Sequence, residues 1–341
     1  MDNTIKRVGF ACKFMSADRS LKPKQLKEIE QPFNFRCTTI KWLREHIDEA
    51  QTRVEELVEH NLNATENLVD YVSSLPLEQR MVRLSSDMLP AYTEPSYGYL
   101  TKTNYLTDLI ATRLGSIGDK ARANQVRLSM HPGQFCVLAS TRPEVVENSI
   151  REIEYHTDIA RFMGYGREFQ DFKINVHISG RNGPDGIKDI LPRLSSEARN
   201  CITIENDENS WGIDASLELA DDLALVLDIH HHWVHSAGEY ILPDDDRVKR
   251  IIDSWRGVRP VIHYSVSRED YLVDHPSDIK PDYKALLEKG YKKGKLRAHS
   301  DFMWNSACNE WAASFRDKFD IMVESKCKNL ASIPFEVATR N

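Results

Sequence analysis

The feature that most constrains the fold is a series of eight short runs rich in apolar and β-branched residues, which recur along almost the whole chain. They span residues 7–12, 81–86, 125–131, 172–179, 200–206, 223–230, 259–265 and 320–325. Several runs are almost continuously apolar, as in INVHI and LALVLDI, which is typical of parallel strands buried on both faces. Consecutive runs are far enough apart to leave room for a crossover helix each time.

Amphipathic segments of helical length lie between these runs. We expect helices over 40–60, 143–164 and, shorter, 215–220, with Pro143 in a first turn and Gly164 at a helix end. Strand followed by helix, eight times over, predicts a single (β/α)8 TIM barrel of the α/β class. A doubly wound open sheet is the alternative, but no glycine-rich phosphate loop follows the first run.

Composition fits one large domain. The chain has 341 residues, of which 41% are hydrophobic and 28% charged, so it can bury a substantial core. We expect a barrel domain over 1–328 and a C-terminal tail over 329–341. Six cysteines without a CxxC pair indicate reduced thiols.

The location of the protein is also constrained by composition. No apolar run approaches the roughly 18 residues of a membrane span, and charges interrupt the N-terminus where a signal peptide would be apolar. We therefore expect no membrane association and a cytoplasmic protein, or a nuclear one if the source is eukaryotic; a bacterial chain would be nucleoid-associated or phage-encoded. The net charge of −7 excludes a globally basic nucleic-acid binder but leaves room for a local basic groove.

Ionisable residues stand at or just beyond the C-terminal end of nearly every predicted strand, where TIM barrels carry their active sites. A lone histidine in a strand is most often a hydrogen-bonded core residue, and a buried carboxylate is rare unless it is paired. A whole set at one end of one barrel needs another explanation. The residues are Asp87, His131, His177, Glu205, Asp228, His231, His263, His299 and Glu324.

This mixture of imidazole and carboxylate groups suits divalent Mn, Zn or Fe, and it is too large for one ion. We therefore expect two or three ions, which is the arrangement that activates water and stabilises a phosphodiester displacement. Of the three consecutive histidines at 230–232 we favour His231, because Asp228 lies three residues before it and both can reach one metal.

The order of these motifs resembles the UV-damage endonuclease family. The motifs are NATENL (63–68), RLSSDMLP (83–90), SMHPGQ (129–134), VHISG (176–180), IENDE (204–208), DIHHH (228–232), IHYS (262–265), AHSD (298–301) and MVESK (322–326). The resemblance runs from about residue 7 to 328. It implies a TIM-barrel DNA repair hydrolase that nicks the backbone on the 5′ side of UV photoproducts, leaves a 3′-hydroxyl and uses divalent metal ions, most often Mn.

The resemblance also implies roles for individual residues. The implied metal ligands are His131, His177, Glu205, Asp228, His231, His263, His299 and Glu324, among which we take Glu205, His131, His263 and Glu324 as catalytic. Gln134 and Phe135 match a pair that wedges into the duplex at the lesion.

This chain departs from the family pattern at four positions. Asp87 stands where some members have His, and Phe135 stands where Tyr is common, which keeps a stacking face but loses the hydroxyl. Phe14 replaces a frequent Asn, so one lesion contact is missing. Val261 replaces a Lys that some members carry two residues before the strand-7 histidine. The lesion range could therefore differ from that of the family.

A dense basic stretch stands just before His299. It contains Lys289, Lys292, Lys293, Lys295 and Arg297, interleaved with Tyr291. Such a run is often only a solvated helix end, but its position favours contacts with DNA phosphates, for which we single out Lys292, Lys293, Lys295 and Arg297. Damaged double-stranded DNA is the expected partner, and we expect a monomer.

Two other functions compete with this hypothesis. A metal-dependent sugar isomerase or epimerase can place the same ligands on the same fold, because a fold alone does not decide the function. It would have no use for a wedge pair or a basic run. A non-catalytic sensor of DNA distortion would predict lost ligands, and none of the eight is lost.

Overall fold

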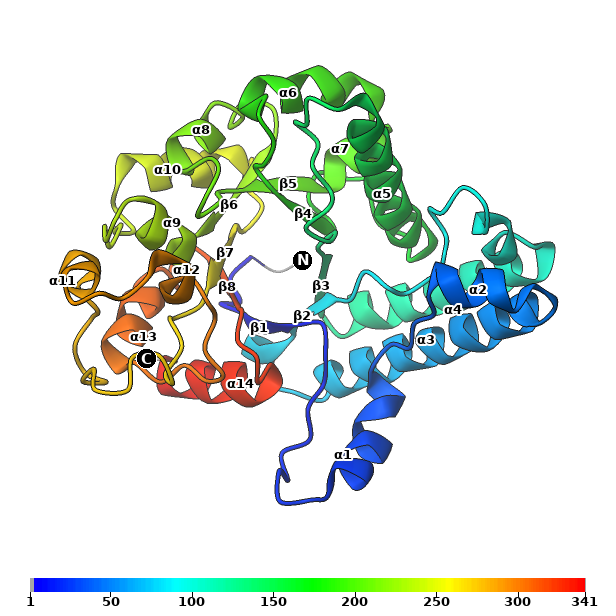
Figure 1. Ribbon diagram of the computed structural model, residues 1–341, viewed down its shortest axis with the longest axis horizontal. Coiled ribbons are helices and arrows are strands. Elements are labelled where there is room, and N and C mark those ends of the chain that lie inside the picture. Colours follow the sequence, from blue (N-terminus) through cyan, green and yellow to red (C-terminus); the bar gives the residue numbers. More distant parts are fainter. Residues whose placement is uncertain (1–2, 341) are drawn as a thin grey trace.

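The structure, a computed structural model, describes residues 3–340 and contains a closed barrel of eight parallel strands in sequential order, surrounded by helices (Figure 1). The predicted TIM barrel is confirmed. The strands are β1 Val8–Ala11, β2 Met81–Leu84, β3 Arg127–Met130, β4 Lys173–His177, β5 Ile202–Glu205, β6 Ala224–Asp228, β7 Val261–Tyr264 and β8 Asp320–Val323.

Each strand lies inside one of the eight predicted runs and is somewhat shorter than the run. Nearly all strand residues are buried, as expected where side chains fill the barrel on one face and meet helices on the other. The register sets the height of the polar residues. His177 on β4 pairs with Glu205 on β5, and Asp228 on β6 pairs with His263 on β7, so adjacent strands deliver these groups at one level.

The helices fill the connections between strands. They are α1 Pro23–Glu30, α2 Ile40–Glu45, α3 Ala50–Ser73, α4 Asn104–Ala123, α5 Pro143–Phe162, α6 Gly183–Ile190, α7 Ser196–Cys201, α8 Ile213–Leu217, α9 Ile229–His235, α10 Asp246–Ser254, α11 Tyr283–Glu288, α12 Lys293–Leu296, α13 Ser306–Ala313 and α14 Asn329–Ala338. Short 3-10 turns add η1 Gln31–Phe33, η2 Ile47–Glu49, η3 Leu77–Gln79, η4 Gly98–Thr101 and η5 Leu191–Arg193.

The helix predictions were partly right. α5 begins at Pro143 as expected, and Gly164 follows its end with a φ of +80°, a conformation that glycine adopts without strain. The helix expected over 40–60 is instead two helices. His46 leaves the helical conformation with φ −131° and ψ 51°, so α2 stops and α3 starts again at Ala50 and continues to Ser73.

The tail expected over 329–341 is wrong for most of its length, because α14 occupies Asn329–Ala338. Phe335 is buried and its ring lies 5.3 Å from that of Tyr264 on β7. Glu336 is fully buried and pairs with Arg316. Pro334 inside the helix removes one backbone donor and hides the helical signal in the sequence.

The N-terminal end of the barrel is closed by a buried charge network. Asp320 at the start of β8 is fully buried and accepts hydrogen bonds from Arg127 Nη1 at 2.7 Å and Arg259 Nε at 2.8 Å. The backbone N–H of Arg7 donates to the same carboxylate at 2.8 Å. Opposite charges thus meet here at hydrogen-bond distance.

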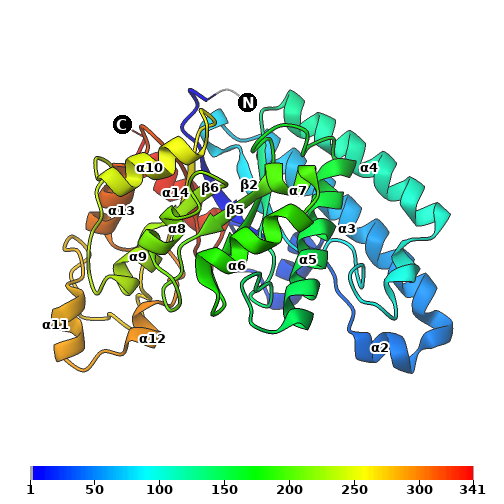
Figure 2. The same cartoon turned by 90° about the horizontal axis from the view of Figure 1, so that it is seen from above.

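Long connections between strands surround the opposite, C-terminal end of the barrel. Figure 2 shows α2 at one lower corner of the molecule and α11 with α12 at the other, beyond the strands. α2 follows β1 and the other two helices follow β7, so all three belong to the C-terminal end of the barrel. Among residues 3–340 no helix combines the length and apolar character needed to cross a bilayer.

Candidate functional site

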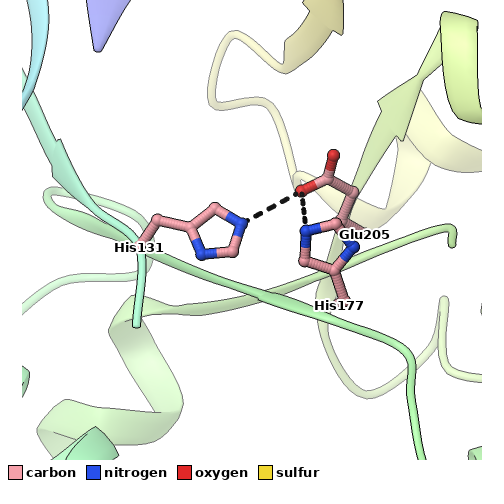
Figure 3. Close-up of side chains that lie close together, drawn as sticks. All are labelled: His131, His177 and Glu205. Atoms are coloured by element: carbon pink, nitrogen blue, oxygen red, sulfur yellow. Dashed lines mark ion pairs between the residues drawn. The ribbon is translucent and has the colours of Figure 1, made fainter. Parts of the chain in front are cut away.

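The C-terminal end of the barrel is organised around Glu205, the last residue of β5. Its side chain is buried, and three of its histidine contacts run from His131 Nε2 at 3.5 Å, His177 Nε2 at 3.9 Å and His263 Nδ1 at 3.0 Å. Figure 3 shows His131 and His177 directed at the same carboxylate. His231 Nδ1 lies 3.6 Å from Oε1 of Glu205.

These neighbours determine the charge state of Glu205. Burial alone would raise its pKa, but the nearby imidazoles of His263 and His177 hold the pKa well below its usual range. Asn175 on β4 also donates a hydrogen bond to this carboxylate. Glu205 is therefore an ionised carboxylate in a buried position.

Asp228 sits where β6 gives way directly to α9. Its Oδ1 accepts a hydrogen bond from the backbone N–H of His231 at 2.7 Å and so caps the helix. Its Oδ2 is buried and has no hydrogen-bond partner among the described residues, and it lies 3.8 Å from His231 Nδ1. The side chains of Asp228 and His231 lie close together, as predicted, because Asp228 caps the helix that carries His231.

The histidine rings are held by a second partner. His131 Nδ1 lies 2.8 Å from the Pro132 carbonyl and His231 Nδ1 lies 3.1 Å from the Asn206 carbonyl, so each Nδ1 can donate and each Nε2 is free to bind a ligand. His177 Nδ1 lies 3.5 Å from Asp207. This pairing of imidazoles with backbone and carboxylate oxygens is the usual support of metal-binding histidines.

The pKa values of the histidines diverge. Burial lowers the pKa of His131, and it lowers the pKa of His263 to about 4, so both rings are neutral near pH 7. Burial also opposes the charge of His231, but Asp228 and Glu205 outweigh it and raise the pKa of His231 to about 9. Burial opposes the charge of His177 as well, and Glu205 with Asp207 outweighs it and raises that pKa.

Glu324 and His299 form the remaining part of the predicted set. His299 Nδ1 lies 3.8 Å from Glu324 Oε2, and His263 Nδ1 lies 3.2 Å from Glu324 Oε1. Arg83 on β2 pairs with the same carboxylate. Burial would raise the pKa of Glu324, but Arg83 and His263 hold it well below its usual range.

Among residues 3–340, three overlapping groups of side chains have the geometry to hold a metal ion. They are His131 with His177 and Glu205, then His177 with Glu208 and His231, and then Glu205 with Asp228 and His263. The unpartnered Asp228 Oδ2 and the imidazole–carboxylate donor set both fit a divalent ion. All eight predicted ligands therefore lie at one end of the barrel, and six of them fall in these groups.

Several polar residues in the site were missed by the sequence analysis. Lys173 starts β4, yet its Nζ reaches 3.1 Å from His263 Nε2, and burial lowers its pKa to about 7. Arg83 stands inside an apolar strand in the same way. Asp207 and Glu208 are part of the IENDE motif but had been given no role. The available signal was a charged residue within a buried strand or directly after one.

The predicted DNA contacts lie around this end. Gln134 and Phe135 follow β3 and are exposed, with 84% of Phe135 accessible. Lys292, Lys293 and Lys295 are exposed in or beside α12. Arg297 and Asp87 each have a neighbour within the protein. Arg297 is engaged in an ion pair with Glu208. Asp87 is exposed and its carboxylate lies against the Cys37 thiol, outside the three metal-binding groups.

Several known proteins with sequences similar to this chain are UV-damage endonucleases. A family model for UV-endonuclease UvdE matches residues 6–339. A UV-damage endonuclease of Neurospora crassa is 32% identical over 54% of this chain and 30% of its own length. One of Schizosaccharomyces pombe is 28% identical over 81% and 43%. A UV DNA damage endonuclease of Bacillus cereus is 23% identical over 84% and 83%. The chain thus spans less than half the length of the fungal relatives.

Solved structures share the fold. SacUVDE superposes with a TM-score of 0.73 at 24% identity, covering 98% of each chain. Endonuclease IV from Thermus thermophilus superposes with a TM-score of 0.51 at 12% identity, covering 81% of this chain and 94% of its own. Because the family match extends over nearly the whole barrel and includes the polar strand ends, the chain belongs to the UV-damage endonuclease family.

Proposed function

We propose that this protein is a metal-dependent DNA repair endonuclease that hydrolyses the backbone on the 5′ side of UV photoproducts and leaves a 3′-hydroxyl. The observation that carries the proposal is the buried Glu205 carboxylate, with four histidine side chains within 3.9 Å, at the catalytic end of a barrel of this family. A sugar isomerase finds no comparable support, because the family match describes an endonuclease.

The protein's own residues would hold and orient the reacting groups. Glu205, with its low pKa, stays ionised and would be among the residues that hold metal. Neutral His131 and His263 are ready to bind metal near pH 7 without losing a proton. Asp228 supplies its unpartnered oxygen from a position fixed by the start of α9.

We propose two or three divalent ions, with Mn favoured over Zn or Fe, held by His131, His177, Glu205, Asp228, His231, His263, His299 and Glu324. When bound, such ions supply positive charge at the scissile phosphate and lower the pKa of water. The catalytic assignment of Glu205, His131, His263 and Glu324 rests on their place at the centre of this set.

The exposed rim would recognise damaged DNA. Phe135 offers an exposed aromatic face beside Gln134, and stacking on an unpaired base is worth roughly 1–3 kcal/mol. Distorted sites cost less to unstack, which would favour lesions over intact duplex. Lys292, Lys293 and Lys295 would contact phosphates. We propose that the protein acts as a monomer in a compartment that contains DNA, the cytoplasm or a nucleus.

A duplex carrying one defined photoproduct tests the proposal. One strand is end-labelled and incubated with protein and Mn²⁺, beside an identical duplex without the lesion. We expect one cut on the 5′ side of the lesion, with a product that a DNA polymerase extends because it ends in a 3′-hydroxyl. A cut at the same rate in the undamaged duplex, or a product that cannot be extended, would contradict the proposal.

A further inference from the structure

Glu208 lies at the edge of the proposed metal site, in the loop after β5. Its side chain is only 11% exposed, and its Oε2 lies 3.7 Å from His231 Nε2. Together with His177 and His231 it forms one of the three groups with metal-binding geometry. Neither the sequence motifs nor the predicted ligand set gave it a role.

The orientation of His231 decides which atom faces Glu208. His231 Nδ1 lies 3.1 Å from the Asn206 carbonyl, which can only accept a hydrogen bond. The Nδ1–H is therefore directed at that carbonyl, and Nε2 is the ring atom that faces Glu208 Oε2. A metal ion that displaces the proton from Nε2 would lie between two donor atoms, the imidazole nitrogen and the carboxylate oxygen.

The distance favours a metal ion between these two atoms. At 3.7 Å the two atoms are beyond ordinary hydrogen-bond range, so a shared proton bridges them poorly. Two bonds of about 2.1 Å to one ion place their donor atoms roughly 3.0–3.4 Å apart, so a small closure of the gap completes the geometry.

Two of the three groups share His177, which makes the Glu208 carboxylate more important. His177 belongs to two of the three groups, one with His131 and Glu205 and one with Glu208 and His231. One imidazole nitrogen binds one ion. If His177 serves the ion beside Glu205, an ion at His231 needs another donor, and in the group that contains His231 the carboxylate is Glu208.

Arg297 holds Glu208 in this position. Arg297 Nη1 and Asn209 Nδ2 both donate to Glu208 Oε1, so Oε2 is left to face His231. This pattern, in which one oxygen is fixed by hydrogen bonds and the other binds the ion, is common among ligating carboxylates. Arg297 is therefore already engaged within the protein, unlike the exposed lysines around it.

We propose that Glu208 is a further metal ligand, which binds through Oε2 an ion shared with His231, and that Arg297 is the positioning residue that aims it. This inference rests on the metal site of the proposed function. It reassigns Arg297 from DNA phosphate contact to support of the metal site.

Metal binding without DNA tests the inference. Purified wild type, Glu208→Gln, Arg297→Met and Arg297→Lys are stripped with chelator, checked for folding by circular dichroism and titrated with Mn²⁺ by calorimetry. We expect Glu208→Gln to lose one ion, or to bind it at least about tenfold more weakly, and Arg297→Met to weaken the same ion about tenfold. Arg297→Lys restores part of the affinity, because a lysine can still hold Oε1.

Matched controls are Glu288→Gln and Lys284→Met on α11, which change the same charges at exposed positions and should leave Mn²⁺ binding unchanged. Unchanged ion number and affinity in Glu208→Gln, with wild type binding metal, would overturn this inference alone. Failure of the wild type to bind any Mn²⁺, Zn²⁺ or Fe²⁺ would overturn the metal-dependent function with it. Loss of DNA affinity in Arg297→Met with unchanged metal affinity would return Arg297 to the phosphate role.

Discussion

The two ends of the barrel both bury charge, but they treat it in opposite ways. At the N-terminal end Asp320 receives hydrogen bonds of 2.7 and 2.8 Å from Arg127 and Arg259, so acid and base meet directly. At the C-terminal end most histidine–carboxylate distances run from 3.5 to 3.9 Å, and Asp228 Oδ2 has no partner among the described residues. At the first end acid and base are paired directly, whereas the spacing at the other end is consistent with a metal site.

This difference separates stability from function on one scaffold. A buried ion pair that is broken by removing one partner leaves an uncompensated charge, which is costly. A cluster of imidazoles and carboxylates can instead gain its missing partners on metal binding. Substitutions at the N-terminal end should therefore affect folding, and those at the C-terminal end should affect metal binding and cleavage.

The largest effect is expected for Glu205→Gln. The isosteric change removes the carboxylate that four histidines contact and that would hold metal, so cleavage of irradiated DNA should fall about 10³-fold or more, equivalent to some 4 kcal/mol in the barrier. The variant should remain folded. The rate is measured by gel assay and the fold by circular dichroism, with the exposed Glu218→Gln as control. An insoluble or unfolded Glu205→Gln variant would contradict the proposed contrast between the two ends of the barrel.

Asp320→Asn should show the reverse pattern. Arg127 and Arg259 would lose the buried carboxylate with which both pair, which should lower the free energy of unfolding by about 3 kcal/mol. Mn²⁺ affinity of the folded fraction should not change. Denaturant unfolding measures the free energy of unfolding, and calorimetry measures the Mn²⁺ affinity. The control is Asp317→Asn, which removes an exposed partner of Lys6. A large loss of metal affinity with normal stability would contradict the separation.

Metal affinity should rise with pH. In the metal-free protein burial opposes the charge of His231, but Asp228 and Glu205 raise its pKa to about 9, so the ring carries a proton at pH 7 that metal must displace. Raising the pH from 7 to 8 should therefore strengthen Mn²⁺ binding about tenfold or more, with release of at least one proton, and the gain from His231 should level off above pH 9. Calorimetry in buffers of different ionisation enthalpy counts the proton. Affinity that is flat over this range would argue against His231 as a ligand.

The smallest effect is expected at the rim. Phe135→Ala should reduce the preference for damaged over undamaged duplex about fivefold, the lower end of the value of one stacked base. Phe135→Tyr, which restores the residue common in the family, should keep the preference. Fluorescence anisotropy with both duplexes measures it. An equal loss of affinity for both duplexes would make Phe135 a general contact and not a lesion probe.

Much of this architecture could be predicted from the sequence. The eight apolar runs gave the barrel, since parallel strands buried on both faces leave a continuous signal. His131, Glu205 and His263 were chosen as candidate site residues because polar residues stand out at the ends of apolar strands.

The rest depends on contacts between distant segments. Lys173 reaches His263 only because its long side chain crosses the barrel interior, which no local pattern reveals. The Arg297–Glu208 pair joins residues 89 positions apart. α14 was missed because Pro334 argues locally against a helix that packing of Phe335 stabilises.

The most direct test of the central claim is the nicking of UV-irradiated supercoiled plasmid by chelator-treated protein, before and after Mn²⁺ is added back. The claim that the C-terminal end is completed by metal predicts nicking of irradiated plasmid only, absent with chelator and restored by Mn²⁺. Nicking that persists in chelator, or a folded, metal-loaded protein that leaves irradiated plasmid intact, would contradict it.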